Sequence, residues 1–128
     1  MTASTSNPAA LACRQLLRVT PPPAPGLVTI ATLSAALNQT TALAVSYVPD
    51  QGVLTRASFD AYVAARAAQA EDSPEALAAA IAGDLANEVV PKWLRVTVNR
   101  QSGGVVNHSV TVEERQPGWD HISLFKSP

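Results

Sequence analysis

Three stretches of the chain place apolar residues at alternate positions, which is the pattern of β-strands buried on one side. The clearest stretch covers residues 40–48, where Leu43, Val45 and Tyr47 share one face, and the other two cover residues 92–100 and 105–114. A fourth strand is predicted over residues 27–33, because residues 28–30 are all β-branched. Residues 35–38, between the first two strands, are compatible with a turn or loop.

Two further segments repeat their apolar residues every three or four positions, which predicts amphipathic helices. The first covers residues 55–70 and the second runs from Pro74 to about Val90. Ser73 is a suitable N-cap for the second helix, and Pro91 ends it. Each helix carries its apolar residues on one side. These residues are Phe59, Tyr62 and Val63 in the first helix and Leu77, Ile81 and Leu85 in the second.

The order strand, strand, helix, helix, strand, strand predicts an α+β domain. Turn residues at 49–52 lead from the second strand into the first helix, and a hairpin loop at 101–104 joins the last two strands. The two pairs of strands form two hairpins, which can pair into a four-stranded antiparallel sheet with both helices on one face. Such a sheet has two open edges, and its second face is bare. Apolar residues make up 47% of the chain, yet aromatic residues make up only 5%, so the core is thin. We therefore expect a homo-oligomer.

The chain divides into three parts by composition. Residues 1–26 predict a flexible N-terminal segment that ends in a Pro-rich linker, residues 27–115 form the compact domain, and residues 116–128 form a C-terminal tail. The single cysteine, Cys13, falls in the N-terminal segment, where we expect a loosely held thiol. One cysteine cannot form an intrachain disulfide, so we expect a reducing compartment, the cytoplasm.

Charge and composition exclude several classes of function. The net charge of −1 gives no basic surface for nucleic acid, and no apolar run reaches the ~18 residues of a membrane span. The potential metal ligands Cys13, His108 and His121 have no recognisable spacing, so we expect no metal site. We predict His108 as a half-buried histidine with a hydrogen-bond partner, and Asp84 and Glu88 on a solvated helix face.

Glu75 opens the second helix and allows two interpretations. An acid in the first turn is favourable with the helix dipole. A carboxylate there can also accept two N–H bonds from the edge of a purine-like or pterin-like heterocycle, which makes Glu75 a candidate ligand anchor.

Several short segments occur in the order and at about the spacings of a known family. They are Val45-Ser46-Tyr47-Val48-Pro49-Asp50, Asp84-Leu85, Pro91-Lys92-Trp93-Leu94-Arg95-Val96 and Gly103-Gly104. With the element order, they resemble the 7-cyano-7-deazaguanine reductases of queuosine biosynthesis, which have the tunnelling fold (T-fold). That resemblance implies an oligomeric barrel of edge-to-edge subunits. It also implies a cysteine that attacks the nitrile, an aspartate that handles protons, and NADPH as the hydride donor.

The resemblance assigns the family's site to positions of this chain. Its cysteine position falls on Thr32, or on Ser34 with a small gap, and its aspartate position falls on Gln39. Its substrate-binding glutamate is retained as Glu75, whereas the histidine before that glutamate is replaced by Pro74. The nucleophile is therefore missing, because only a cysteine has an appreciable anionic fraction near neutral pH.

Three hypotheses follow. The first is a reductase-like protein that binds a purine-like or pterin-like heterocycle through Glu75 at a subunit interface, without nitrile reduction. The second is an active NADPH-dependent oxidoreductase that uses Thr32 or Ser34, with Gln39, near the chemistry. The third is a non-catalytic structural or interaction protein.

Overall fold

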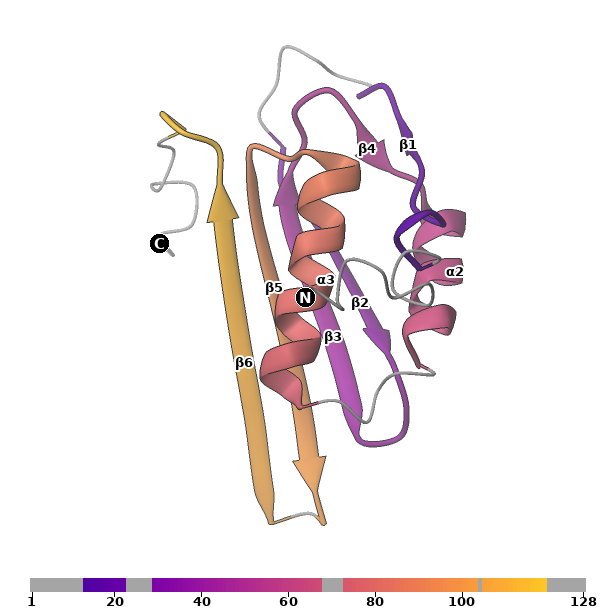
Figure 1. The fold of residues 1–128 in the computed structure, drawn as a ribbon, viewed down its shortest axis with the longest axis vertical. Helices are drawn as coiled ribbons and strands as arrows, with labels where there is room; N and C mark the ends of the chain where they lie inside the picture. The colour runs from indigo at the N-terminus through magenta and orange to yellow at the C-terminus, as the bar shows by residue number, and fades with distance from the viewer. Residues whose placement is uncertain (1–12, 23–28, 68–72, 104, 120–128) are drawn as a thin grey trace, which may run out of the picture.

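The computed structural model describes residues 13–22, 29–67, 73–103 and 105–119 of the 128-residue chain (Figure 1). Its elements have the α+β order that the sequence predicts, with two short strands added. They are β1 (Val19–Thr20), β2 (Ala31–Ala36), β3 (Thr41–Val48), β4 (Val53–Leu54), α2 (Arg56–Ala67), α3 (Pro74–Val89), β5 (Trp93–Ser102) and β6 (Val106–Arg115).

The main sheet has the order β2-β3-β5-β6, and every neighbouring pair is antiparallel. Leu33, Val45, Val96 and Val112 form one cross-strand row from edge to edge. The row is apolar because these residues share the face that the helices cover. The four-stranded antiparallel sheet of the prediction is therefore confirmed.

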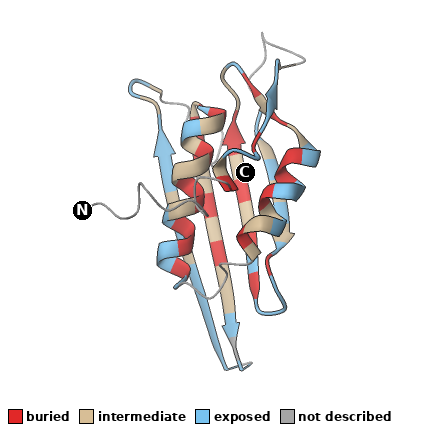
Figure 2. Ribbon diagram, turned by 45° about the vertical axis from the view of Figure 1, so that its right-hand side comes forward, coloured by how far each residue is buried: buried red, intermediate tan, exposed pale blue. Residues whose placement is uncertain are grey.

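Both helices and the covered sheet face share one core. Tyr62 of α2, Ile81 of α3 and Val45 and Val96 of the sheet are each fully buried in it. Figure 2 shows the buried stripes on the helices and on the central strands, whereas β6 is largely exposed. The alternation of apolar residues thus produces a sheet with one helix-covered face and one open face.

Local signals fix α3. The Ser73 side chain accepts a hydrogen bond from the Ala76 N–H, and Pro74 occupies the start of the helix, where its missing N–H costs nothing. At the other end, Val90 adopts a left-handed conformation with φ 49° and closes the helix. These signals place Glu75 in the first turn of α3.

The N-terminal segment differs from the prediction. Cys13 and Leu17 are each 3% exposed and belong to the core, and β1 pairs with β4. Gly52 permits this pairing, because a Cβ there would lie 2.9 Å from the Val19 side chain. The flexible segment predicted over residues 1–26 therefore does not include residues 13–20, and Cys13 is not loosely held.

Several element bounds also differ from the prediction. Strand β2 continues through Ala35 and Ala36, so the turn expected at 35–38 begins only at residue 37. Strand β5 continues through residues 101 and 102, which the sequence predicts as part of the hairpin loop. Residues 27–28, 68–70, 104 and 120–128, on which parts of other predictions fall, lie outside the described residues.

The open face of the sheet is lined by small side chains. Ser34, Ala36, Ala42 and Ala44 border a shallow depression of about 420 Å³ there, beside Thr97 and Asn99. None of the described helices is both long and apolar enough to cross a membrane.

Candidate functional site

Glu75 and His108 form a contact at the N-terminal end of α3. The His108 Nε2 lies 2.9 Å from the Glu75 Oε2, although the two residues are 33 positions apart in the sequence. The Glu75 side chain is 61% exposed and the His108 side chain 43% exposed. The hydrogen-bond partner expected for His108 is therefore present, but the histidine is more exposed than predicted.

The surroundings of Glu75 favour its ionised form. Its own backbone N–H and the hydrogen bond from His108 hold the pKa of the carboxyl below its usual value. Its place in the first turn of α3 acts in the same direction, because the helix dipole attracts negative charge there. Glu75 thus presents an ionised carboxylate at the surface.

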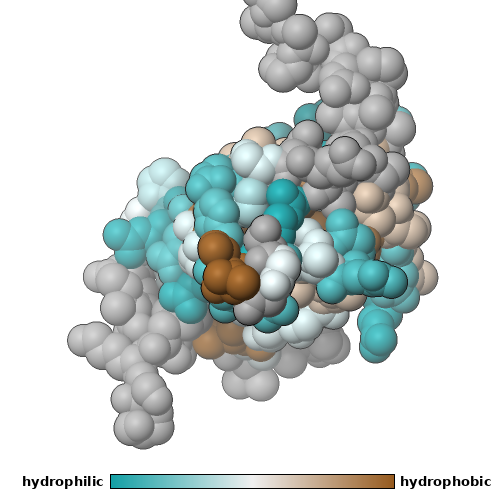
Figure 3. Space-filling model, turned by 90° about the horizontal axis from the view of Figure 1, so that it is seen from below, coloured by the Kyte–Doolittle hydropathy of each residue, from teal (hydrophilic) through white to brown (hydrophobic). Residues whose placement is uncertain are grey.

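Figure 3 shows this end of the molecule from below. Near the middle of the view in Figure 3, a small apolar spot lies among hydrophilic side chains, and further apolar surface shows towards the lower edge and the right. The exposed apolar residues of the β5–β6 hairpin are Val105, which is 87% exposed, and Val106, which is 57% exposed.

Thr32 and Ser34 lie on β2, with exposed side chains on the open face of the sheet. The Thr32 Oγ1 lies 3.2 Å from the Ser46 Oγ, and either hydroxyl is able to donate. This partner is not a base that activates a nucleophile. Gln39 is exposed in the bend between β2 and β3.

The structure does not bring these positions together within one chain. Thr32 and Ser34 lie on one edge strand, whereas His108 lies on the other edge strand and Glu75 lies above it. Three inter-strand spacings separate β2 from β6, which is roughly 14 Å. Gln39 does lie at the same end of the sheet as His108, because β2, β3, β5 and β6 are in register there.

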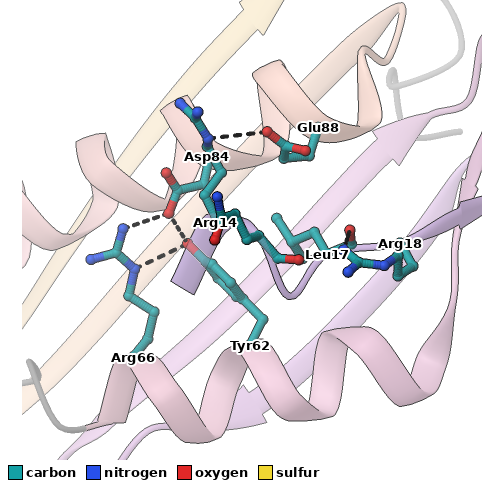
Figure 4. A network of polar contacts seen from close by, with 8 residues as sticks. Arg14, Leu17, Arg18, Tyr62, Arg66, Asp84 and Glu88 are labelled. Atoms are coloured by element: carbon teal, nitrogen blue, oxygen red, sulfur yellow. Dashed lines mark hydrogen bonds and ion pairs between the residues drawn. The ribbon is translucent and has the colours of Figure 1, made fainter. Parts of the chain in front are cut away.

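A second polar cluster, which the sequence did not reveal, joins α2 to α3 (Figure 4). The Tyr62 hydroxyl donates to the Asp84 Oδ2 at 2.6 Å, and the Arg66 guanidinium contacts the same oxygen at 2.5 Å. The side chains of Arg66 and Asp84 are only 4% and 14% exposed. Burial and the neighbouring Asp84 raise the pKa of Tyr62, so its hydroxyl stays protonated.

The prediction of a solvated helix face is therefore wrong for Asp84, which belongs to the buried cluster with Tyr62 and Arg66. Glu88 is about one third exposed and lies beside the N-terminal segment. The Arg14 Nε lies 3.1 Å from the Glu88 Oε2, close enough for an ion pair although not aligned as a hydrogen bond. Both contacts hold elements of the core together.

Cys13 is the only cysteine of the chain, and it lies in the core beside the helices. It therefore does not replace the missing nucleophile on β2. Among the described residues, His, Cys, Asp and Glu side chains form no group of three or more that is placed to hold a metal ion.

The fold defines the class of the chain as an α+β domain with two helices over a four-stranded antiparallel sheet. No family model matches the chain. The chain is distantly related to the NADPH-dependent 7-cyano-7-deazaguanine reductase of Nitrosococcus oceani, with 31% identity over 86 residues. The alignment covers 67% of this chain and 66% of the relative, so it spans just under two thirds of that protein.

Proposed function

We propose that the chain is a divergent T-fold protein of the 7-cyano-7-deazaguanine reductase family that binds a purine-like or pterin-like heterocycle without reducing a nitrile. The observation that carries this proposal is the ionised carboxylate of Glu75, held by His108 at the exposed end of α3. Such a carboxylate accepts two N–H bonds from the amide and amino groups of a guanine-like edge.

The described residues do not fit nitrile reduction. The reaction needs a nucleophile that holds the nitrile carbon while NADPH supplies hydride, and Thr32 offers a hydroxyl whose nearest polar partner is the hydroxyl of Ser46. A hydroxyl without a base is a weak nucleophile near neutral pH. The only thiol, that of Cys13, is buried elsewhere.

The strand order supports a ligand site between two copies of the chain. With four antiparallel strands, β2 runs antiparallel to β6, so a rotated second copy is able to add its β2 beside β6 and continue the sheet. Since Gln39 lies at the same end of the sheet as His108, this arrangement brings the partner subunit's Gln39 towards Glu75. We expect such a homo-oligomeric barrel in the cytoplasm.

Calorimetry with 7-cyano-7-deazaguanine, guanine and pterin tests the ligand proposal. We expect wild-type protein to bind at least one of them, and Glu75→Gln to weaken that binding roughly tenfold or more, because it removes a charged acceptor. Asp60→Asn is the matched control, since Asp60 is an exposed acid on α2. Binding that Glu75→Gln leaves unchanged would contradict the anchor.

The relationship to an NADPH-dependent reductase supports a second candidate, an active oxidoreductase of queuosine biosynthesis. In that case the chain oxidises NADPH when 7-cyano-7-deazaguanine is present, and Thr32→Ala or Gln39→Ala abolishes the oxidation. A chain that neither binds the three heterocycles nor oxidises NADPH would contradict both candidates and favour the third hypothesis, a structural or interaction protein.

A further inference from the structure

We propose that His108 is a positioning residue for Glu75, which holds the carboxylate in the orientation that binds the ligand. This inference rests on the proposed function of Glu75. It adds a residue from a different element, since His108 comes from β6 and Glu75 from α3.

The hydrogen bond between them has a definite direction. An ionised carboxylate only accepts, so the His108 Nε2 must carry the hydrogen in the 2.9 Å contact. The contact fixes one oxygen of an otherwise exposed side chain, and His108 is itself held on a strand that is paired along its length with β5. A long, mobile acid is thereby held in one geometry before a ligand arrives.

The contact leaves room for the ligand. A carboxylate has about four acceptor positions. The Glu75 backbone N–H and the His108 ring each occupy one of them. About two positions remain, which is what a guanine-like edge with two N–H donors requires. His108 therefore supports a bidentate ligand rather than competing with it.

Few charged groups surround the pair in the part of the chain that the structure describes. Arg100 on β5 is the cross-strand neighbour of His108, and its guanidinium donates to Thr41. The nearest residues of β6 on the same face, Val106 and Val110, do not titrate. On α3 the next acid, Asp84, is more than two turns away and pairs with Arg66. His108 is thus the neighbouring side chain that holds the carboxylate.

The pH dependence follows from the direction of the Glu75 shift. The carboxylate must be ionised to accept two N–H bonds, so binding fades as the pH falls through the lowered pKa of Glu75. Without His108, this pKa rises part of the way to its usual value, because the Glu75 backbone N–H still lowers it. The loss of binding then moves to higher pH.

The test measures the dissociation constant of 7-cyano-7-deazaguanine between about pH 4 and about pH 8. This range includes the pH at which an ordinary Glu carboxyl titrates. We expect His108→Ala to weaken binding about fivefold to tenfold at neutral pH and to move the acid limb to higher pH. His108→Gln, which keeps a donor near the Nε2 position, restores much of both. Asn107→Ala, the neighbouring β6 residue with its side chain on the other face, leaves both unchanged.

The outcomes separate this inference from the function on which it rests. If Glu75→Gln removes binding but His108→Ala leaves it unaltered at every pH, the positioning role of His108 is overturned and the proposed function is not. Wild-type protein that binds none of the three heterocycles overturns the proposed function. In that case carbon NMR of the Glu75 carboxyl still decides the contact, because an unchanged pKa in His108→Ala shows that the pair does not form in solution.

Discussion

Asp84 and Glu88 are one turn apart on α3, and the contrast between them can be measured. Replacing Asp84 by Ala removes a buried carboxylate that contacts the Arg66 guanidinium, which is 4% exposed, and takes away the acceptor of the Tyr62 hydroxyl. Removing one member of a buried ion pair costs about 3–5 kcal/mol. We expect urea denaturation to show a loss of this size in the free energy of unfolding of Asp84→Ala.

Glu88→Ala is the control, because the side chains of Glu88 and Arg14 are about one third exposed. Pairs of that kind contribute about 0–1 kcal/mol. Equal losses in the two variants would show that the Asp84 cluster is not desolvated as the structure indicates.

At the scale of elements, the N-terminal segment is the part of the fold that most needs a test. Leu16 and Leu17 are adjacent, but Leu17 is 3% exposed whereas Leu16 is 38% exposed. Since a buried Leu→Ala change costs about 2–5 kcal/mol, we expect Leu17→Ala to lower the thermal midpoint clearly. Leu16→Ala should leave it nearly unchanged. Two variants that behave alike would mean that residues 13–20 do not pack on the domain in solution.

The sequence predicts the long elements because their periodicity is strong, and it misses the short ones for physical reasons. The strand pair β1–β4 has two residues in each strand, too few for any alternation to appear. Ala35 and Ala36 have weak strand propensity, so pairing with β3 rather than their own preference makes them part of β2. The proline run at 21–25 suggested a linker, although the chain before it packs on the core.

In the candidate site too, positions within one helix could be predicted from the sequence, whereas contacts between elements could not. Glu75 could be placed from the sequence, because the N-cap Ser73 and Pro74 define the start of α3. Its contact with His108 could not, since it depends on how α3 crosses β6. Charged residues such as Arg66 and Asp84 are usually solvated on helices, so periodicity alone gives no sign that these two pair in the interior.

At the scale of the whole molecule, the proposed assembly depends on the two edge strands of the sheet, β2 and β6. Along an antiparallel strand, the backbone N–H and C=O of one residue point to the strand on one side, and those of the next residue point to the strand on the other side. The Gln101 N–H donates to the Thr40 carbonyl, so the odd-numbered residues of β5 face β3 and the even-numbered ones face β6. Even-numbered residues of β5 pair with even-numbered residues of β6. The backbone N–H and C=O groups of the odd-numbered β6 residues therefore point away from β5, towards the open edge of the sheet.

Thr111 lies among these outward-facing residues, on the face of the sheet that no helix covers. Proline at this position removes an N–H that points away from β5, and an edge strand tolerates that change when its edge meets only water. If a second copy pairs with β6, however, the lost donor and the proline ring disrupt the intersubunit ladder. The effect of Thr111→Pro therefore distinguishes a β6 edge that is exposed to water from one that pairs with a second copy.

We expect sedimentation of the wild-type chain to give a multiple of its 13.3 kDa mass, and Thr111→Pro to shift it towards the monomer with its circular dichroism unchanged. Thr111→Ala is the matched control. It removes the same side chain, including its 3.0 Å contact with Thr97, but keeps the backbone N–H, so the assembly should persist. A wild-type chain that sediments as a 13.3 kDa particle would contradict edge pairing. It would also remove the second copy that the heterocycle site between subunits requires, leaving Glu75 to act alone at the surface.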